Sequence, residues 1–321
     1  MPICLSHQSA LHYWLTKTED ECIPDCSEKR SIALMSASMR EIKEAGLPLD
    51  FSKDDPLHVL VPSHEEQRNL RSVVTHLWRA KLPKGSLYQL SGMNLGCSPE
   101  LAFVQMASCR SLVQCVEVGC HLTGKFAISD RGRGYAGKRA VLTTPEEMEA
   151  YLRQLFRVHG LVRAREALQY IVPNTASPME VLLVMAFVLP PCLGGWDMPQ
   201  VVANQRIDID EELRPLVNER YFEGDLYLPT VRGNVEYDSY EFHTGKYRYD
   251  HTQTRRNILE AMDVKTVSAT WGQLDTFEKF MTFMNMVKRR FGIERRNFTK
   301  EERKEQEKLY EQLTDRNSRL F

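Results

Sequence analysis

The sequence lacks an excess of charge of either sign. Its 42 Lys and Arg residues and 43 Asp and Glu residues give a formal net charge of −1 at pH 7. A chain this close to neutral has no overall electrostatic attraction for nucleic acid or for an anionic membrane. Any surface of that kind must therefore come from local clustering of basic residues.

Long hydrophobic runs are also missing. The longest one, residues 181–189, is much shorter than the roughly 20 residues that cross a bilayer. Residues 1–15 lack both the basic start and the continuous apolar stretch of a signal peptide. The sequence therefore predicts a cytoplasmic protein that has no membrane partner.

The eight cysteines include no Cys-x-x-Cys pair of the kind that zinc ribbons use. We expect reduced thiols that pack as small hydrophobic side chains rather than disulfides or zinc ligands. Internal repeats and low-complexity tracts are absent as well. With 42% hydrophobic and 26% charged residues, the 321-residue chain has the composition and length of about two globular domains.

The first third of the chain predicts a mixture of helices and strands. Apolar residues at helical spacing predict two short helices within residues 7–45. The segment LHVLVP at 57–62 predicts a strand. Residues 73–79 and 87–90 flank a turn and are expected to pair as a β-hairpin.

A helix is expected from Ser98, which a proline follows, to about His121. A basic, glycine-rich segment comes next at 125–139. It is similar to a phosphate-binding P-loop, but Arg139 stands where that motif has the Ser or Thr that holds magnesium. We expect a surface loop that contacts a nucleic-acid backbone at most. The following helix begins with a capping box at Thr144.

The second half of the chain predicts a helix, three strands, a helix, a strand and a helix, with a helix crossing between the third and fourth strands. We therefore expect a fold of the α+β or α/β class, with an αβββαβ core preceded by a domain of helices and β-hairpins. The expected elements are a buried apolar helix from Ser177, strands at 203–210, 220–229 and 234–239, a helix at 249–262, a strand at 264–270 and a helix at 274–291.

Three acidic residues are expected to converge on this sheet. Asp225 lies in the second predicted strand, and Glu236 and Asp238 share one face of the third because side chains alternate along a strand. Converging carboxylates repel one another unless a hard cation neutralises them, and oxygen ligands suit Mg²⁺ or Mn²⁺. The alternative is a solvated strand face without a metal ion.

Several short motifs follow one another in the second half. In chain order they are Ser177-Pro-x-Glu180, Gly224-Asp225-Leu-Tyr-Leu-Pro229, Val235-Glu-Tyr-Asp238, His243, Asp250 with Arg255 and Arg256, and a strand that ends in Thr270. Together they resemble the very-short-patch-repair-like endonuclease domain, which has the PD-(D/E)XK restriction-endonuclease fold. The resemblance covers about residues 160–280.

This resemblance implies roles for individual residues. Asp225 and Glu236 would hold the metal ion, joined by Glu180 from the first helix. Glu180 is equally explained as the third residue of a helix cap that begins at Ser177. Asp238 stands where the wider fold has a lysine.

Without that lysine, another group must activate the water and stabilise the phosphate. Members of the family that also lack the lysine use histidine, which favours His243 as the group that moves protons, with Lys246 as a second candidate. For His243 the alternative is a half-exposed loop histidine without a catalytic part. The implied activity is hydrolysis of DNA phosphodiesters, in defence or repair, with Mg²⁺ or Mn²⁺ as cofactor.

Basic residues near the expected core are candidates for holding DNA. Of Arg255 and Arg256, one is expected to pair with an acid and the other to meet a phosphate. Residues 288–321 hold 11 Lys or Arg and 7 Asp or Glu residues. A solvated helix face is the alternative for this segment. Its densest basic cluster consists of Lys288, Arg289, Arg290, Arg295 and Arg296.

The first half has a second likeness. The segments SALHYW, LHVLVP, THLWRAKLP and CSPELAFVQMA resemble antitoxins of the AbiEi abortive-infection type over about residues 5–125, which implies a DNA-binding or regulatory module. A helix-turn-helix is not predicted there. We expect three parts: this region at 1–125, a loop and linking helix at 126–159, and the endonuclease-like domain with basic C-terminal helices at 160–321.

Two other functions are compatible with the sequence. One is a DNA-binding regulator or antitoxin-like protein that uses a nuclease fold without its chemistry, and the other is a structural or protein-binding module. A partner protein or a homo-oligomer fits each of them.

A metal site requires Asp225 and Glu236 on neighbouring strands with both side chains on one face. A Glu236 buried in an ion pair with Arg255, without a cleft beside it, would favour the regulator.

Overall fold

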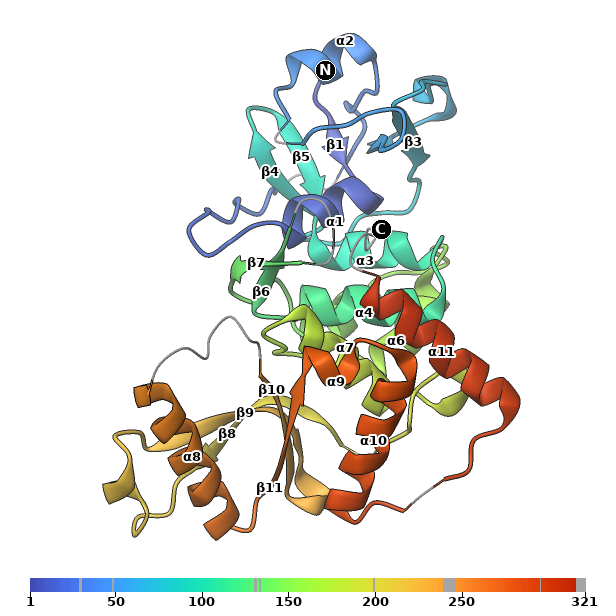
Figure 1. Ribbon diagram of the computed structural model, residues 1–321. Helices are drawn as coiled ribbons and strands as arrows, with labels where there is room; N and C mark the ends of the chain where they lie inside the picture. The colour runs from blue at the N-terminus through green and yellow to red at the C-terminus, as the bar shows by residue number, and fades with distance from the viewer. Residues whose placement is uncertain are drawn as a thin grey trace. The chain divides into compact units, whose positions relative to one another are not determined.

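The computed structural model describes residues 1–28, 31–47, 49–129, 132, 134–198, 200–238, 246–294 and 296–315, with the backbone alone for 246–251. The protein is of the α+β class, with helices and more than one sheet (Figure 1). Its chain divides into two compact units, Met1–Ile171 and a second one that starts at Val172.

The first unit is built on a mixed five-stranded sheet in the order β3-β2-β1-β5-β4 (Figure 1). Neighbouring strands alternate between parallel and antiparallel pairing across this sheet. A separate ribbon joins β6 and β7. The strands are β1 (Cys4–Leu5), β2 (Leu57–Val61), β3 (Val73–Leu77), β4 (Leu87–Ser91), β5 (Asn94–Cys97), β6 (Phe126–Ile128) and β7 (Tyr135–Lys138).

The helices of the first unit are α1 (His7–Leu15), α2 (Met39–Glu44), α3 (Pro99–Ala107), α4 (Leu112–Leu122), α5 (Pro145–Arg153) and α6 (Leu161–Leu168). Helix α1 contacts both α3 and β2. Its Trp14 is buried and donates its indole N–H to the carbonyl of Cys97, 2.8 Å away. A buried tryptophan needs such a partner, so this bond fixes α1 to the sheet.

The second unit holds a four-stranded sheet in the order β11-β10-β9-β8. Strand β9 is antiparallel to both β8 and β10, and β11 runs parallel to β10. The elements are α7 (Pro178–Val188), β8 (Val202–Asp208), β9 (Tyr221–Leu228), β10 (Gly233–Asp238), α8 (Lys246–Ala261), β11 (Lys265–Thr270), α9 (Trp271–Leu274), α10 (Phe277–Phe291) and α11 (Lys300–Thr314). This succession confirms the elements predicted for the second half.

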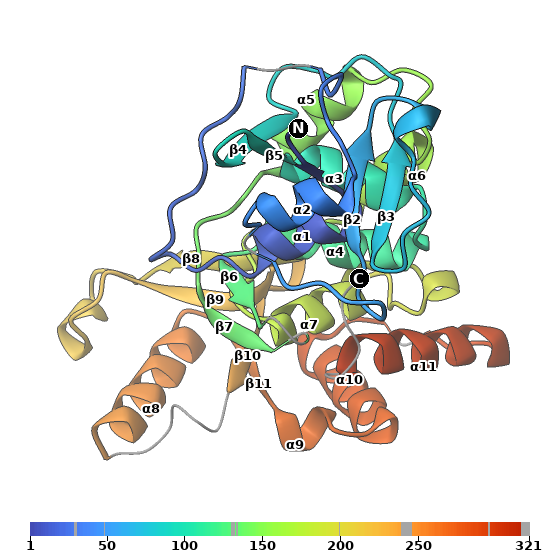
Figure 2. The ribbon, with the colours of Figure 1, turned by 90° about the horizontal axis from the view of Figure 1, so that it is seen from above.

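Helices cover both faces of this sheet, with α8 on one side and α10 on the other (Figures 1 and 2). On the α8 side, Phe222 of β9 packs in one apolar cluster with Ile258 and Leu259 of α8. On the α10 side, Gly233 leaves room for Phe291, whose ring lies where a Cβ would be. Each buried side chain of this size contributes about 1.5 to 3 kcal/mol.

Helix starts were predictable from the sequence. Ser98, Thr144 and Ser177 each accept the backbone N–H three residues ahead at 3.2 Å, as expected of N-caps. The helix expected from Ser98 to His121 is nevertheless two helices, because Ser111 caps a new one through a box with Gln114.

The predicted hairpin between residues 73–79 and 87–90 is wrong. Strand β3 pairs in parallel with β2, and β4 forms its hairpin with β5 instead. Gly92, at φ +52°, supplies the left-handed conformation in that turn. Of the two helices expected within residues 7–45, the second covers only Met39–Glu44.

Within the glycine-rich segment at 125–139, residues 126–128 and 135–138 pair as a β-ribbon that the expected surface loop did not include. Arg139 is buried and donates to the backbone carbonyls of Trp14, His121 and Gly124. Burial also lowers the pKa of this guanidinium to about 10. Arg139 therefore joins backbone segments of the first unit and has no exposed face for a phosphate.

Candidate functional site

Asp225 and Glu236 lie on neighbouring strands. The antiparallel pairing of β9 with β10 places Leu226 opposite Val235, one step from both acids. The Oδ2 atom of Asp225 accepts the backbone N–H of Tyr237 at 2.7 Å. Because Tyr237 is the residue after Glu236, this bond holds the Asp225 carboxylate beside the Glu236 segment of β10.

Glu180 approaches Asp225 from the other side. Its Oε2 atom accepts the side-chain N–H of Asn204 at 2.7 Å. On β8, the neighbours of Asn204 pair with Leu226 and Gly224, so Asn204 lies across from Asp225. The backbone of Asn204 has φ +49°, a left-handed conformation that asparagine tolerates better than most residues. Asp225 is thus flanked by Glu180 through Asn204 and by Glu236 through Tyr237.

We call Glu180, Asp225 and Glu236 the acid cluster. The pKa of Asp225 is raised from its ordinary value to about 7, first by burial and then by the negative charges of Glu180 and Glu236. The Tyr237 N–H and the Arg255 charge act in the opposite direction and do not cancel the increase. The negative charges of Glu180 and Glu236 therefore disfavour the ionised form of Asp225.

Glu236 has a cation of its own. Its Oε1 atom accepts hydrogen bonds from Nη2 and Nε of Arg255, at 2.7 and 3.1 Å. The same oxygen accepts the side-chain N–H of Asn234 at 3.0 Å. The Arg255 and Glu236 side chains are 23% and 17% exposed. Of the adjacent Arg255 and Arg256 on α8, Arg255 is thus the one that pairs with an acid, while Arg256 is exposed.

Glu180 also belongs to a helix cap. Its Oε1 atom accepts the Ser177 hydroxyl at 3.0 Å, and its Oε2 atom accepts the Ala176 N–H at 2.7 Å. The positive end of the α7 dipole stabilises a carboxylate in this first turn. The cap explains why Glu180 stands at the start of α7, and the bond to Asn204 connects it to the acid cluster.

The donor set fits a hard divalent cation in its chemistry. All three side chains are carboxylates, and oxygen ligands suit Mg²⁺ or Mn²⁺. As they stand, the residues that the structure describes include no group of three or more His, Cys, Asp and Glu side chains arranged to hold a metal ion. Within the acid cluster, Glu236 is engaged by Arg255, so ligation requires that this carboxylate be shared or released.

Asp238, His243 and Lys246, predicted to assist the acids or to move protons, come at the end of β10 or after it in sequence. Asp238 is half-buried at its last position, beside Thr270 of β11. His243 falls outside the described residues. Lys246 is the first residue of α8, and its side chain is not described.

The basic residues predicted to hold DNA differ in exposure. Lys288 is 4% exposed, with its ammonium 5.0 Å from the Trp196 ring centroid, which leaves it little surface for a phosphate. Arg289 is exposed. Two others have acidic partners: Arg290 lies 3.8 Å from Glu260, and Arg296 lies 2.6 Å from Glu302. Arg295 is outside the described residues.

Sequence reasoning missed a second titratable group, His7, His58 and His76 of the first unit, which we call the histidine cluster. Nδ1 of His58 lies 2.8 Å from Nε2 of His76, and the His7 ring stacks on His76 with centroids 3.5 Å apart. Burial and the neighbouring rings lower the pKa of His7 to about 2 and that of His76 to about 4.

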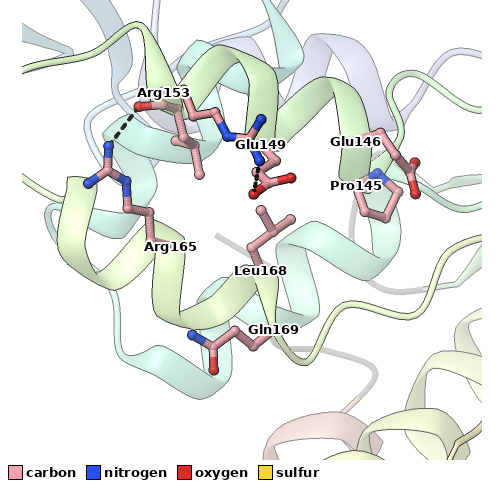
Figure 3. Close-up of a pocket in the computed structure, with 8 residues that line it drawn as sticks. Pro145, Glu146, Glu149, Arg153, Arg165, Leu168 and Gln169 are labelled. Carbon is pink, nitrogen blue, oxygen red and sulfur yellow. Dashed lines mark hydrogen bonds and ion pairs between the residues drawn. The ribbon is translucent and has the colours of Figure 1, made fainter.

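A hollow of about 520 Å³ lies between α5 and α6 (Figure 3). Glu149 and Arg153 form an ion pair at 2.6 Å across one rim, and Arg165 donates to the Leu152 carbonyl. Leu168 lines it as well. Glu149, Arg153 and Arg165 thus have their partners within α5 and α6.

Comparisons with protein-family models, curated proteins and solved structures give no match to this chain. The site is therefore argued from its own residues. Among the described residues, no helix is both long and apolar enough to cross a membrane.

Proposed function

We propose that the second unit is a metal-dependent endonuclease that hydrolyses DNA phosphodiesters, as its resemblance to the very-short-patch-repair-like domain implies. The observation that carries this proposal is the position of Asp225, a half-buried carboxylate held between Glu180 and Glu236. Carboxylates this close to one another repel, and a divalent cation would relieve that repulsion and supply the water that a metal-dependent hydrolase uses.

The order of elements supports the same proposal. A helix with an acid in its first turn, three antiparallel strands, a crossing helix and a parallel fourth strand is the order expected of a PD-(D/E)XK core. The two acids at its centre, Asp225 and Glu236, come from the second and third strands. These are the positions that the resemblance gives to the metal ligands.

In this proposal Asp225 and Glu236 hold Mg²⁺ or Mn²⁺, with Glu180 as the third acid. The bound metal supplies a water of lowered pKa and neutralises charge that develops on the phosphate. Asp238 assists at the end of β10, and His243 moves protons, with Lys246 as the second candidate. The Tyr237 N–H orients Asp225, and Asn204 orients Glu180.

A plasmid-nicking assay with Mg²⁺ tests this function, with Asp225→Asn as the inactive variant and Asp210→Asn as a matched control. Asp210 is an exposed acid of the same unit, beyond the end of β8. We expect Asp225→Asn to lower the nicking rate at least about 100-fold, because it removes a metal ligand. Equal nicking by the wild type and Asp225→Asn would refute the nuclease.

The ion pair between Arg255 and Glu236 favours a second candidate function. If that pair is permanent, the unit is a DNA-binding platform without chemistry, such as a regulator or an antitoxin-like protein. The AbiEi-like resemblance of the first unit agrees with this alternative. It predicts salt-dependent DNA binding that needs no Mg²⁺ and survives Asp225→Asn.

Two substitutions, one at an exposed basic residue and one at a buried basic residue, test DNA binding itself. Arg289→Gln removes an exposed charge and should weaken DNA binding several-fold and reduce the salt dependence. Lys288→Met removes a buried charge and should leave both nearly unchanged. A protein with no affinity for DNA at low salt would instead be a structural or protein-binding module.

A further inference from the structure

Arg255 is held by partners from two strands. Its Nη2 and Nε atoms donate to Oε1 of Glu236 on β10, and Nη2 also donates to the carbonyl of Glu223 on β9. Its guanidinium carbon lies 4.9 Å from the ring centroid of Phe222. These contacts fix the guanidinium over the part of the sheet that carries the acid cluster.

The pair is partly removed from solvent. Only 17% of the Glu236 side chain is exposed. Without Arg255, this carboxylate would lose the cation that compensates its charge. An unpaired, partly buried carboxylate is costly, so the ion pair stabilises the protein when no other cation is present.

A divalent cation on Glu236 conflicts with this arrangement. Two N–H groups of Arg255 and one of Asn234 already occupy Oε1. A metal ion at the same carboxylate would also be repelled by the adjacent guanidinium charge. We propose that Arg255 is a built-in counter-cation of Glu236, which a divalent metal ion must displace before the acid cluster can hold it.

This inference rests on the proposed function and adds a regulatory step to it. Arg255 limits metal occupancy at low metal concentration and keeps the cluster intact in the metal-free protein. The displaced guanidinium remains on α8 beside the site, where it is available to a phosphate of the substrate.

Calorimetric titration of MnCl₂ into the full-length protein, without DNA, tests the proposal. We expect Arg255→Gln to bind Mn²⁺ about tenfold more tightly than the wild type, the order expected from removing one charge several ångströms away. Arg206→Gln is the matched control, since Arg206 pairs with Asp208 at 2.7 Å on the same sheet but both side chains are largely exposed. That control should bind Mn²⁺ like the wild type.

Arg255→Lys keeps the charge and should also bind Mn²⁺ like the wild type. Comparing it with Arg255→Gln distinguishes the loss of the charge from the loss of the arginine side chain. Equal or weaker Mn²⁺ binding by Arg255→Gln, together with loss of binding in Asp225→Asn, would overturn the role of Arg255 and leave the proposed function standing. Absence of Mn²⁺ binding in both the wild type and Arg255→Gln would overturn the proposed function and this inference with it.

Discussion

The acid cluster and the histidine cluster bury the same number of titratable side chains and differ in how they deal with charge. The three histidines become neutral by remaining unprotonated, and their rings satisfy one another by stacking and by the contact between His58 and His76. In the acid cluster, Glu236 is paired with Arg255, and the pKa of Asp225 is raised to about 7 by burial and by the two other carboxylates between which it lies.

Because of this difference, the histidine cluster is a packing arrangement, whereas the acid cluster is a candidate functional site. Neutral histidines pack like other aromatic side chains, so the histidine cluster needs nothing further. In the acid cluster, Asp225 borders two other carboxylates and its pKa is raised to about 7. Perturbed acids of this kind are typical of functional sites.

The largest expected effect comes from neutralising Asp225. Its folded-state pKa of about 7 lies above the ordinary value of 3.8, so ionisation destabilises the metal-free protein increasingly as the pH rises between these values. We expect Asp225→Asn to stabilise the metal-free protein by about 1 to 3 kcal/mol at pH 8 and by much less near pH 4. Urea unfolding at both pH values measures this.

Asp210→Asn serves as the control for that experiment, because Asp210 is exposed. A destabilised Asp225→Asn protein at pH 8 would show that the hydrogen bond from Tyr237 outweighs the repulsion within the acid cluster. The contrast with the histidine cluster would then disappear.

The histidine cluster should respond to pH in the opposite direction. The folded-state pKa values of His7 and His76, about 2 and 4, lie below the ordinary 6.5. Their contribution to stability is therefore complete above pH 6.5 and is lost as the pH falls from there toward 4. We expect the melting temperature of the first unit to fall by several degrees between pH 7 and pH 5.

His76→Phe should reduce this pH dependence, since phenylalanine keeps the stacking and cannot be protonated. His64→Gln, at an exposed histidine of the same unit, should retain it. The account of the histidine cluster fails if melting curves of the two variants show the same pH dependence.

The smallest effect is expected for Glu180→Gln. This substitution distinguishes the role of Glu180 in the helix cap from its role in the acid cluster. The single oxygen of glutamine can still accept hydrogen bonds from Ala176 and Asn204, and its amide can donate to the Ser177 hydroxyl, so the stability should change by less than about 1 kcal/mol. Mn²⁺ affinity should fall less than tenfold in a calorimetric titration, whereas Asp225→Asn abolishes it. A loss as large as that of Asp225→Asn would make Glu180 an equal metal ligand.

Much of the second unit could be predicted from sequence because its signals are local. Alternating side chains marked β8, β9 and β10, and the helix start at Ser177 carried its cap in four consecutive residues. The neighbouring positions of Asp225 and Glu236 followed from the short connection between their strands. Which arginine pairs with Glu236 did not follow, because adjacent helix residues point about 100° apart and tertiary packing decides which one faces the sheet.

The histidine cluster could not be predicted because it depends on long-range strand pairing. His58 and His76 come together since β2 and β3 run parallel, with Leu60 opposite His76. The expected hairpin gave β3 a different partner and concealed this register. Arg139 was misjudged for a related reason, since its carbonyl acceptors lie in α1 and at or just after the end of α4, both distant from Arg139 in the sequence.

The central claim is that the acid cluster is a divalent-cation site. Anomalous diffraction from crystals soaked in MnCl₂ tests it most directly. The account predicts a peak roughly 2.0 to 2.6 Å from a carboxylate oxygen of Asp225 and of Glu236, with Arg255 displaced from Oε1. A cluster without a peak at saturating Mn²⁺, with the ion pair between Arg255 and Glu236 intact, would contradict it.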